Sequence, residues 1–414
     1  MSTTDLPPRF TTDLEDTLPL PLPNDAAAAA DGHSITTTSS SRQRRWDDPP
    51  EDEPGAPPPP PPENFTTMVF VKTGRVAPEA LGEIMHLTWA ANDTHVIGMT
   101  PKGRNLRTIS PDGPCLLATW SLATGRRLPN PQMGQGVRLS GAFALKPGGV
   151  AMADMVVACP FLDAYSGLAS YDTYPNRPVP RVEAFDLGRR FRLMKLDAAM
   201  GAPLAWSLDG RVLVGVSTRD SSRVVVVGLT QRGNNGTGKV ERVLMTHSDE
   251  VTQLAFLPAW GVCAGALVSA GRDGYVRVTS VESGRTLKKI EIGARAPASI
   301  LRVAPDGNVV VTVWGRDVVV WYLDSGRVHN YNLNAIRSAE GWPLSVSPDC
   351  RYLACRTEDG FDVSDVLTGM FRGEFATRGD PITSVAFNSD GTRVAVGDYG
   401  GLLQIFEVVT PPTE

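Results

Sequence analysis

Arginine directly precedes aspartate in three short polar turns, and this pairing is the clearest sign of binding chemistry in the sequence. The pairs are Arg219-Asp220, Arg272-Asp273 and Arg316-Asp317. A guanidinium forms paired hydrogen bonds with carboxylate and phosphate groups. The three arginines therefore predict a site for an acidic or phosphorylated peptide. The alternative is that each aspartate shapes its own turn, while each arginine pairs locally or meets solvent.

Two further turns of the same kind carry acidic and aromatic residues, Glu358-Asp359 and Asp398-Tyr399. Tyr275 and Trp314 stand next to the arginine turns, so they and Tyr399 are candidate aromatic anchors for a partner. Trp314 fits packing inside a strand core equally well. The candidate partner-binding residues are Arg219, Arg272, Tyr275, Arg316, Asp359 and Tyr399.

Patterns typical of catalysis or metal binding are missing from the sequence. It holds no G-x-S-x-G nucleophile turn, no G-x-x-x-x-G-K-[ST] phosphate loop and no H-E-x-x-H zinc motif. Gly233–Gly238 is glycine-rich, but no helix follows to supply the amide dipoles that hold phosphate, so we expect a flexible loop. The five histidines and five cysteines show no spacing typical of a metal site. We therefore expect no catalytic residue, no metal and no cofactor.

A sequence repeat defines the elements that position the polar turns. From residue 65 onward, short Val-, Leu- and Ile-rich runs alternate with Gly, Asp and Asn turns, which is typical of antiparallel strands. Turn aspartates stand at positions 209, 306, 349 and 390, with intervals of 97, 43 and 41 residues, and 97 fits two repeats. A second marker, Ser283-Gly284, Ser325-Gly326 and Thr368-Gly369, recurs at 42 and 43 residues. Such a period corresponds to one four-stranded unit.

The clearest unit covers residues 247–292. Its expected strands are Val251–Leu257, Ala266–Gly271, Tyr275–Val281 and Thr286–Ile292. Arg272-Asp-Gly274 makes the tight turn between the second and third strands, where glycine accepts the positive φ that such hairpins need.

This unit resembles the WD40 repeat family through His247, the segment Leu267–Gly274 and the segment Val276–Gly284. The resemblance implies that His247, Ser269 and Asp273 form a hydrogen-bonded set that locks the strands of one blade. Thr279 stands where the family has tryptophan, so the set is incomplete. In the next unit, 295–333, Trp321 fills that tryptophan position.

The resemblance implies an all-β fold, a seven-bladed WD40-like β-propeller over residues 65–414. Six full units precede Ile382–Val408, which supplies three strands of a seventh. Thr66–Lys72 is expected to supply the fourth strand and so to close the ring. Closure removes the long unpaired sheet edges of an open array. Units 135–196 and 199–245 diverge most, the first with an insertion near 163–179.

The resemblance also implies a function. In WD40 propellers the turns between the second and third strands surround one mouth of the central channel, where partners often dock. We therefore expect a non-enzymatic scaffold or adaptor that binds protein or peptide partners there, as a monomeric propeller within a complex. One alternative is a propeller enzyme, a lactonase-like hydrolase or a quinone-dependent oxidoreductase, with its site in the axial channel. Another is a folded spacer in a larger assembly.

Residues 1–64 differ in composition from the rest. Residues 1–62 hold 14 of the 34 prolines, and eleven acidic against four basic residues. Such a segment buries too little apolar surface to offset its ordering entropy, so we expect a disordered, acidic, Pro/Ser/Thr-rich tail. Pro57–Pro62 favours polyproline II, as a ligand of proline-binding domains or as a solvated spacer. Arg42–Arg45 is a short basic cluster that the following acidic residues dilute.

Charge and sorting signals limit the partners and the compartment. The formal charge of −5 is carried by the tail, so the near-neutral body offers no concentrated basic face for nucleic acid. We find no secretory signal and no apolar run of about 18 residues, and expect no membrane contact. The odd number of cysteines and the lack of C-x-x-C pairs indicate reduced thiols. We expect a cytoplasmic or nuclear protein.

Overall fold

A computed structural model describes strands and turns of the unit that spans residues 64–414. The described residues are 69–76, 83–90, 93–101, 115–128, 137–139, 143–147, 156–163, 181–187, 191–196, 198–232, 235–293, 296–333, 342–377 and 380–409. The expected tail of residues 1–64, with Pro57–Pro62 in it, lies outside them, as does the expected insertion beyond Asp163. Among the described residues, no helix has the length and apolar character that a membrane span requires.

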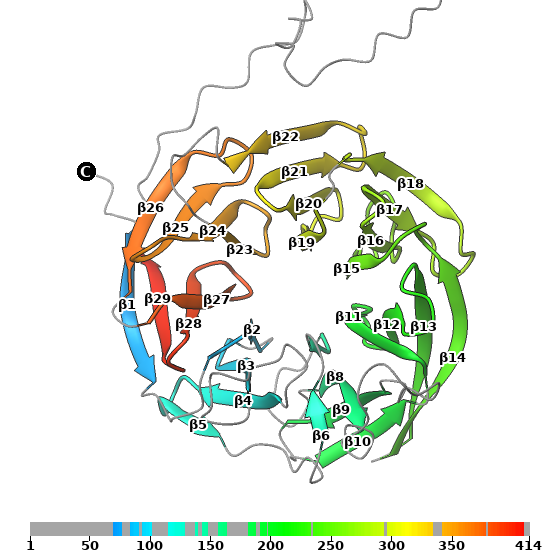
Figure 1. Ribbon diagram of the computed structural model, residues 1–414, viewed down its shortest axis with the longest axis horizontal. Coiled ribbons are helices and arrows are strands. Elements are labelled where there is room, and N and C mark those ends of the chain that lie inside the picture. The colour runs from blue at the N-terminus through cyan, green and yellow to red at the C-terminus, as the bar shows by residue number, and fades with distance from the viewer. Residues whose placement is uncertain are drawn as a thin grey trace, which may run out of the picture. The chain divides into compact units, whose positions relative to one another are not determined.

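The strands form seven antiparallel sheets that stand around a ring, and each sheet is one blade (Figure 1). Blade 1 contains β2 (His86–Trp89), β3 (His95–Pro101), β4 (Cys115–Ser121) and β5 (Arg126–Leu128). Blade 2 contains β6 (Val137–Leu139), β7 (Ala144–Leu145), β8 (Val156–Asp163), β9 (Arg181–Asp186) and β10 (Phe191–Leu196). Blade 3 contains β11 (Met200–Trp206), β12 (Val212–Ser217), β13 (Arg223–Arg232) and β14 (Asn235–Met245).

The remaining four blades follow in chain order. Blade 4 contains β15 (Val251–Phe256), β16 (Leu267–Gly271), β17 (Tyr275–Thr279) and β18 (Thr286–Glu291). Blade 5 contains β19 (Ala298–Val303), β20 (Val309–Trp314), β21 (Asp317–Tyr322) and β22 (Val328–Asn332). Blade 6 contains β23 (Trp342–Val346), β24 (Tyr352–Arg356), β25 (Gly360–Asp365) and β26 (Phe371–Ala376). Blade 7 contains β27 (Ile382–Phe387), β28 (Arg393–Asp398), β29 (Leu403–Val409) and β1 (Val69–Val76).

The first described strand of the chain closes the ring, so this part of the sequence prediction is confirmed. β1 pairs antiparallel with β29, from Val69 opposite Val409 to Val76 opposite Leu403. The strand runs further along the chain than the expected Thr66–Lys72. The register shifts between Lys72 and Gly74, so a bulge carries the strand beyond Lys72, where we expected it to end.

The turn aspartates that revealed the repeat all have the same hydrogen bond. In each of four turns, Oδ1 of the aspartate accepts the backbone N–H two residues later, at 2.8 to 3.1 Å. The residue after the aspartate has a positive φ in every case, for Gly210, Gly307, Cys350 and Gly391. These turns join the first and second strands of blades 3, 5, 6 and 7. The spacing of the aspartates therefore reports the spacing of the blades.

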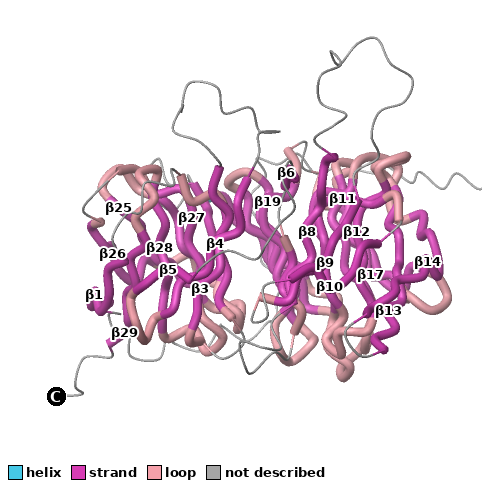
Figure 2. Tube along the Cα trace, turned by 90° about the horizontal axis from the view of Figure 1, so that it is seen from below, coloured by secondary structure: helices cyan, strands magenta, loops and turns pink. Residues whose placement is uncertain are grey.

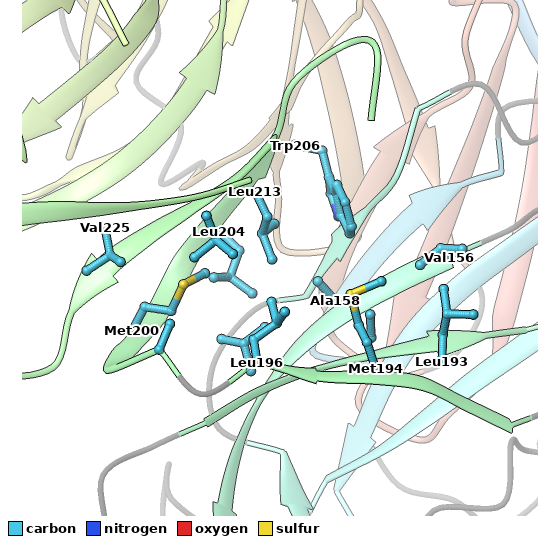
Figure 3. Packing of buried hydrophobic residues seen from close by; sticks show 14 residues of the cluster. Val156, Ala158, Leu193, Met194, Leu196, Met200, Leu204, Trp206, Leu213 and Val225 are labelled. Atoms are coloured by element: carbon cyan, nitrogen blue, oxygen red, sulfur yellow. The ribbon is translucent and has the colours of Figure 1, made fainter. Parts of the chain in front are cut away.

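The core lies between neighbouring blades, so the middle strands are buried on both faces. Val318, Val319 and Val320 of β21 are all at most 2% exposed. Val319 packs with residues of blade 4, and its two neighbours pack with residues of blade 6. Figure 3 shows the same arrangement between blades 2 and 3, where Trp206 and Leu213 face Val156 and Ala158. A strand that is covered on both faces needs apolar residues at consecutive positions. The sequence of β21 has such a continuous apolar run.

The glycine-rich segment 233–238 corrects one sequence expectation. β13 extends to Arg232 and β14 begins at Asn235, so the pair forms a long hairpin where we expected a flexible loop. The hairpin lies close to blade 2, because a Cβ at Gly238 would come within 2.2 Å of the Leu196 side chain. The absence of a side chain at Gly238 permits this close packing.

Candidate functional site

The ring has two ends, and the strands run between them (Figure 2). The turns between the second and third strands, together with the links between blades, lie at one end, which we call the b–c mouth. Its described turns are 218–222, 272–274, 315–316, 357–359 and 399–402. The other turns lie at the opposite end, which we call the a–b face. Of the six candidate residues, five lie in the b–c turns of blades 3 to 7, and Tyr275 is the first residue of β17.

Arg219 presents its guanidinium to solvent at the b–c mouth. It is exposed and makes no ion pair within the described residues. Its neighbour Asp220 instead accepts from the Ser222 hydroxyl at 2.6 Å and pairs with Arg223 Nε at 2.7 Å. The hydrogen bonds from Ser222 lower the pKa of Asp220. In this turn the Asp220 carboxylate bonds to neighbouring residues of the turn, whereas the Arg219 guanidinium is available to a partner.

Arg272 is held by the link that precedes its own blade. Its Nε lies 2.5 Å from Glu250 Oε2, and both side chains are 46% exposed. Its backbone N–H donates to the Glu250 carbonyl at 2.8 Å. A partner carboxylate or phosphate would have to compete with Glu250 for this guanidinium. Glu250 was not predicted, since only the register of the blades brings residues 22 positions apart together.

His247, Ser269 and Asp273 lie in contact, as the repeat resemblance implied. His247 Nδ1 is 2.8 Å from Asp273 Oδ1, and Nε2 is 2.9 Å from Ser269 Oγ. A Cβ on Gly271 would come within 2.4 Å of His247 Nδ1, so only glycine leaves room for the ring. Burial lowers the pKa of His247 more than the adjacent Asp273 raises it. The imidazole is therefore neutral at pH 7 and links the blade 3–4 connection to β16 and the b–c turn of blade 4.

Thr279 stands at the position of the expected tryptophan and does not complete this set. The residue is 1% exposed, and its Oγ1 has no hydrogen-bond partner within the described residues. A buried hydroxyl without a hydrogen-bond partner destabilises the fold, because no hydrogen bond offsets the loss of its contact with water. Trp321, which fills the equivalent position in blade 5, is 3% exposed and packs in the core between blades 4 and 5.

Tyr275 is engaged along its own blade. The Arg277 guanidinium lies 4.8 Å from the centre of its ring, and the Lys289 ammonium lies 5.8 Å away. The hydrogen bond to Glu291 raises the pKa of the Tyr275 hydroxyl. Arg277 also donates to Asp273 Oδ2 at 3.0 Å. Tyr275 thus contributes to a cluster across β17 and β18.

The remaining candidate binding residues lie in the b–c turns of blades 5 to 7. Arg316 is half-buried, Asp359 is exposed, and Tyr399 is 38% exposed. Trp314 is 1% exposed and donates from Nε1 to Thr312 Oγ1 at 3.0 Å, so it belongs to the core. Tyr399 is therefore the aromatic candidate that is exposed at this mouth.

Acidic residues collect on the blade 6 and 7 side of the mouth. Glu358, Asp359 and Asp380 are exposed there, and Asp398, at the end of β28, is 2% exposed. Burial and the negative charge of Asp380 raise the pKa of Asp398, although its Oδ1 accepts the Leu402 N–H at 2.7 Å. The described charges of the b–c mouth are thus unevenly divided. Arginines occur on blades 3 to 5, beside carboxylates such as Asp220 and Glu250, whereas the described exposed charges on blades 6 and 7 are carboxylates.

The described residues also bear on metal binding and on thiol chemistry. Within them, no group of three or more His, Cys, Asp or Glu side chains is placed to hold a metal ion. Cys263, Cys350 and Cys355 are free and buried. Burial raises the pKa of the Cys350 thiol to about 12, so this thiol is protonated at neutral pH and a poor nucleophile.

Comparison with known proteins agrees with the architecture. A family model described as "WD domain, G-beta repeat" matches residues 368–407, which end in β29. "WD repeat-containing protein SL1-17" of Schistosoma mansoni is 30% identical over 95 residues, which are 22% of this chain and 31% of that relative. The match thus spans about a third of the relative's length. The ring and these matches define a seven-bladed β-propeller with WD repeats. Both matches support the resemblance of this chain to the WD40-repeat family.

Proposed function

We propose that the protein is an interaction scaffold whose b–c mouth binds a segment of a partner protein. WD40 propellers generally serve as non-enzymatic scaffolds for protein interactions. The observation that carries the proposal is the exposed guanidinium of Arg219 at the b–c mouth, which has no ion pair among the described residues. Charged side chains from several blades converge on such a mouth, and they favour a partner of complementary charge.

The divided charge of the mouth suggests the chemistry of the partner. Arg219 offers an open site for a carboxylate or a phosphate, and Arg272 offers a second one if Glu250 is displaced. A partner segment with an acidic or phosphorylated residue therefore fits blades 3 to 5. Tyr399 adds a partly exposed aromatic ring on the opposite side, beside the carboxylates of blades 6 and 7.

We also propose that Pro57–Pro62 is a second, linear contact. Six consecutive prolines favour the polyproline II conformation, which SH3-type and WW-type domains bind in aromatic grooves. Such a contact would work alongside the propeller mouth and raise the avidity for a multidomain partner. We propose a cytoplasmic or nuclear location as well, because Cys263, Cys350 and Cys355 are buried and not paired in disulfides.

Affinity capture tests the proposal. Full-length protein should enrich a specific partner from native lysate, and replacing Arg219, Arg272 and Arg316 by glutamate should reduce its recovery by about tenfold or more. The matched control replaces Arg285 and Arg327 by glutamate, because both are exposed in turns of the a–b face. Equal recovery by the mouth variant and the control would contradict the mouth as the binding site. Recovery of no specific partner by the wild-type protein would contradict the scaffold.

A further inference from the structure

An apolar groove opens between blades 3 and 4 on the a–b face, at the end of the ring opposite the b–c mouth. Its volume is about 530 Å³, and its lining includes Leu208, Val226, Phe256, Val281 and Leu287. We call it the blade 3–4 groove. Its volume lies within the range of pockets that bind specific ligands. The strands of blades 3 and 4, β11 to β18, lie on the right of the ring in Figure 1.

Large exposed apolar side chains gather around this groove. Leu208 and Leu287 in its lining are 48% and 50% exposed. The loop between β15 and β16 contributes Ala259 and Ala264 to the lining, and Trp260 and Val262 of the same loop, outside the lining, are 60% and 52% exposed. Single exposed apolar residues need no explanation, but a cluster beside a groove is typical of an interaction site.

The wall that carries Trp260 is held in a fixed conformation. Trp260 Nε1 donates to the Pro305 carbonyl of blade 5 at 3.0 Å. Within the loop, the Gly265 N–H donates to the Pro258 carbonyl at 2.7 Å, and the Leu257 N–H donates to the Ala266 carbonyl at 2.9 Å. Binding to a preformed wall costs little conformational entropy. The exposed tryptophan is thus presented by an ordered loop that joins β15 and β16.

The charges at the rim of the groove are mainly negative. Glu241 and Glu282 are exposed in the lining and make no ion pair within the described residues. Asp209 contributes a third carboxylate, which lies 3.9 Å from the exposed Arg211. The lining also contains Arg242, whose Nη1 donates to the Glu282 carbonyl. A cation on the groove's occupant would therefore be favoured by the carboxylates of this rim.

We propose that the blade 3–4 groove binds a short segment of a partner protein that carries two large apolar side chains and an adjacent lysine or arginine. The apolar side chains enter the groove and contact Leu208 and Leu287, and the cation faces Glu241 and Glu282. This site is independent of the b–c mouth, because it lies at the other end of the ring and has the opposite charge preference. The protein would then hold two partner segments at once, an acidic one at the mouth and a basic, apolar one at the groove.

A peptide selection tests this proposal even while the partner is unidentified. A library of displayed 16-residue random peptides is selected on the full-length protein and counter-selected on the Leu208→Asp/Leu287→Asp variant. The enriched peptides should combine large apolar residues with lysine or arginine. The affinity of a synthesised, enriched peptide should fall at least tenfold with Leu287→Asp, which is about 1.4 kcal/mol. Glu241→Gln/Glu282→Gln should weaken binding several-fold at low salt, and less at high salt.

Two control variants make the test specific. Leu367→Asp changes a residue that is 43% exposed in an a–b face turn of blade 6, and it should leave the peptide affinity within about twofold. Arg219→Glu should also leave it unchanged, which separates the groove from the proposed mouth. Melting curves of all variants report whether each remains folded.

Several outcomes would overturn the proposal. These are a selection without enrichment, enriched peptides that lack basic residues, and peptides that bind the Leu287→Asp variant as well as the wild type. Sedimentation of the wild-type protein tests the competing occupant. Concentration-dependent dimers that Leu287→Asp dissociates would assign the groove to a second copy of the chain.

Discussion

Asp93 of blade 1 accepts hydrogen bonds from Ser389 of blade 7, 296 positions later in the chain. The Ser389 hydroxyl lies 2.6 Å from Oδ2, and the Ser389 N–H lies 3.1 Å from Oδ1. Asn388 Nδ2 donates to the same carboxylate at 3.1 Å. Asp93 has a φ of 53°, in the left-handed region that aspartate tolerates better than most residues. One side chain therefore joins the first and last blades of the ring.

Replacing Asp93 should weaken the closure of the ring. Asp93→Ala removes three hydrogen bonds and leaves alanine at a positive φ, so we expect the free energy of unfolding to fall by about 2–3 kcal/mol. Asp93→Asn should cost less, because asparagine keeps an acceptor and tolerates the same φ. Urea unfolding measures both effects. Asp390→Ala is the matched control, since that carboxylate accepts only within its own turn, and an equal loss in the control would contradict the closure role.

The pairing of β1 with β29 makes a second prediction, on truncation of the chain. Removal of residues 1–62 leaves β1 intact and should leave the melting temperature unchanged. Removal of residues 1–76 exposes the edge of β29 and should lower the melting temperature and promote aggregation. Light scattering during the thermal melt measures the aggregation. Similar melting of the two truncated proteins would show that β1 does not contribute to the stability of the ring.

Much of the fold could be predicted from the sequence because each blade repeats the same local chemistry. In blades 3, 5, 6 and 7 the same aspartate turn joins the first and second strands, because its Oδ1 accepts a backbone N–H there. The spacing of these aspartates therefore indicates the length of the repeat and the position of the first two strands in it. The limits of β1 were less predictable. We expected the strand to end at Lys72, yet its pairing with β29 continues through a bulge to Val76, and only the partner strand determines this.

The candidate site was less predictable, because its contacts cross between blades. From the sequence, Arg272 has no evident ion-pair partner. In the structure, the link between blades 3 and 4 places Glu250 against its guanidinium. Tyr275 follows the arginine turn directly, yet Arg277 and Glu291 engage it along the strands. The blade 3–4 groove is formed by residues far apart in the sequence, such as Leu208 and Leu287, so no local motif indicates it.

Thr279 makes a third prediction, on stability. Thr279→Val replaces a buried hydroxyl that has no partner in the described residues by a methyl group of similar size, so the free energy of unfolding should rise by about 1 kcal/mol. Thr312→Val is the matched control in β20. That threonine is equally buried, and its hydroxyl accepts from Trp314, so this variant should lose stability. Urea unfolding measures the free energy of unfolding of both variants. A loss of stability in both would mean that the Thr279 hydroxyl has a hydrogen-bond partner.

His247 predicts a pH dependence of stability. Burial lowers its pKa in the folded protein below 6.5, so the unfolded chain binds a proton that the folded protein does not. Stability should therefore fall as the pH decreases from about 6.5 toward the folded pKa, by at most about 1.4 kcal/mol per pH unit for this residue. The pKa of Asp273 is also lowered, which adds a further loss only at pH values below about 4.

His247→Gln isolates this contribution. The variant lacks the titrating ring, so its stability between pH 7 and pH 5 should change less steeply than that of the wild type. The pKa values of His86 and His95 are lowered by burial as well, but both residues are present in the two proteins and cancel in the comparison. Parallel pH curves would mean that His247 is protonated equally in the folded and unfolded states.

Hydrogen exchange of the protein with its captured partner tests the central claim most directly. If the b–c mouth is the binding surface, the partner should slow amide exchange in the turns 218–222 and 399–402, while the a–b turns 304–308 and 347–351 exchange as in the free protein. Protection confined to other surfaces, with unchanged exchange in the b–c turns, would contradict the account.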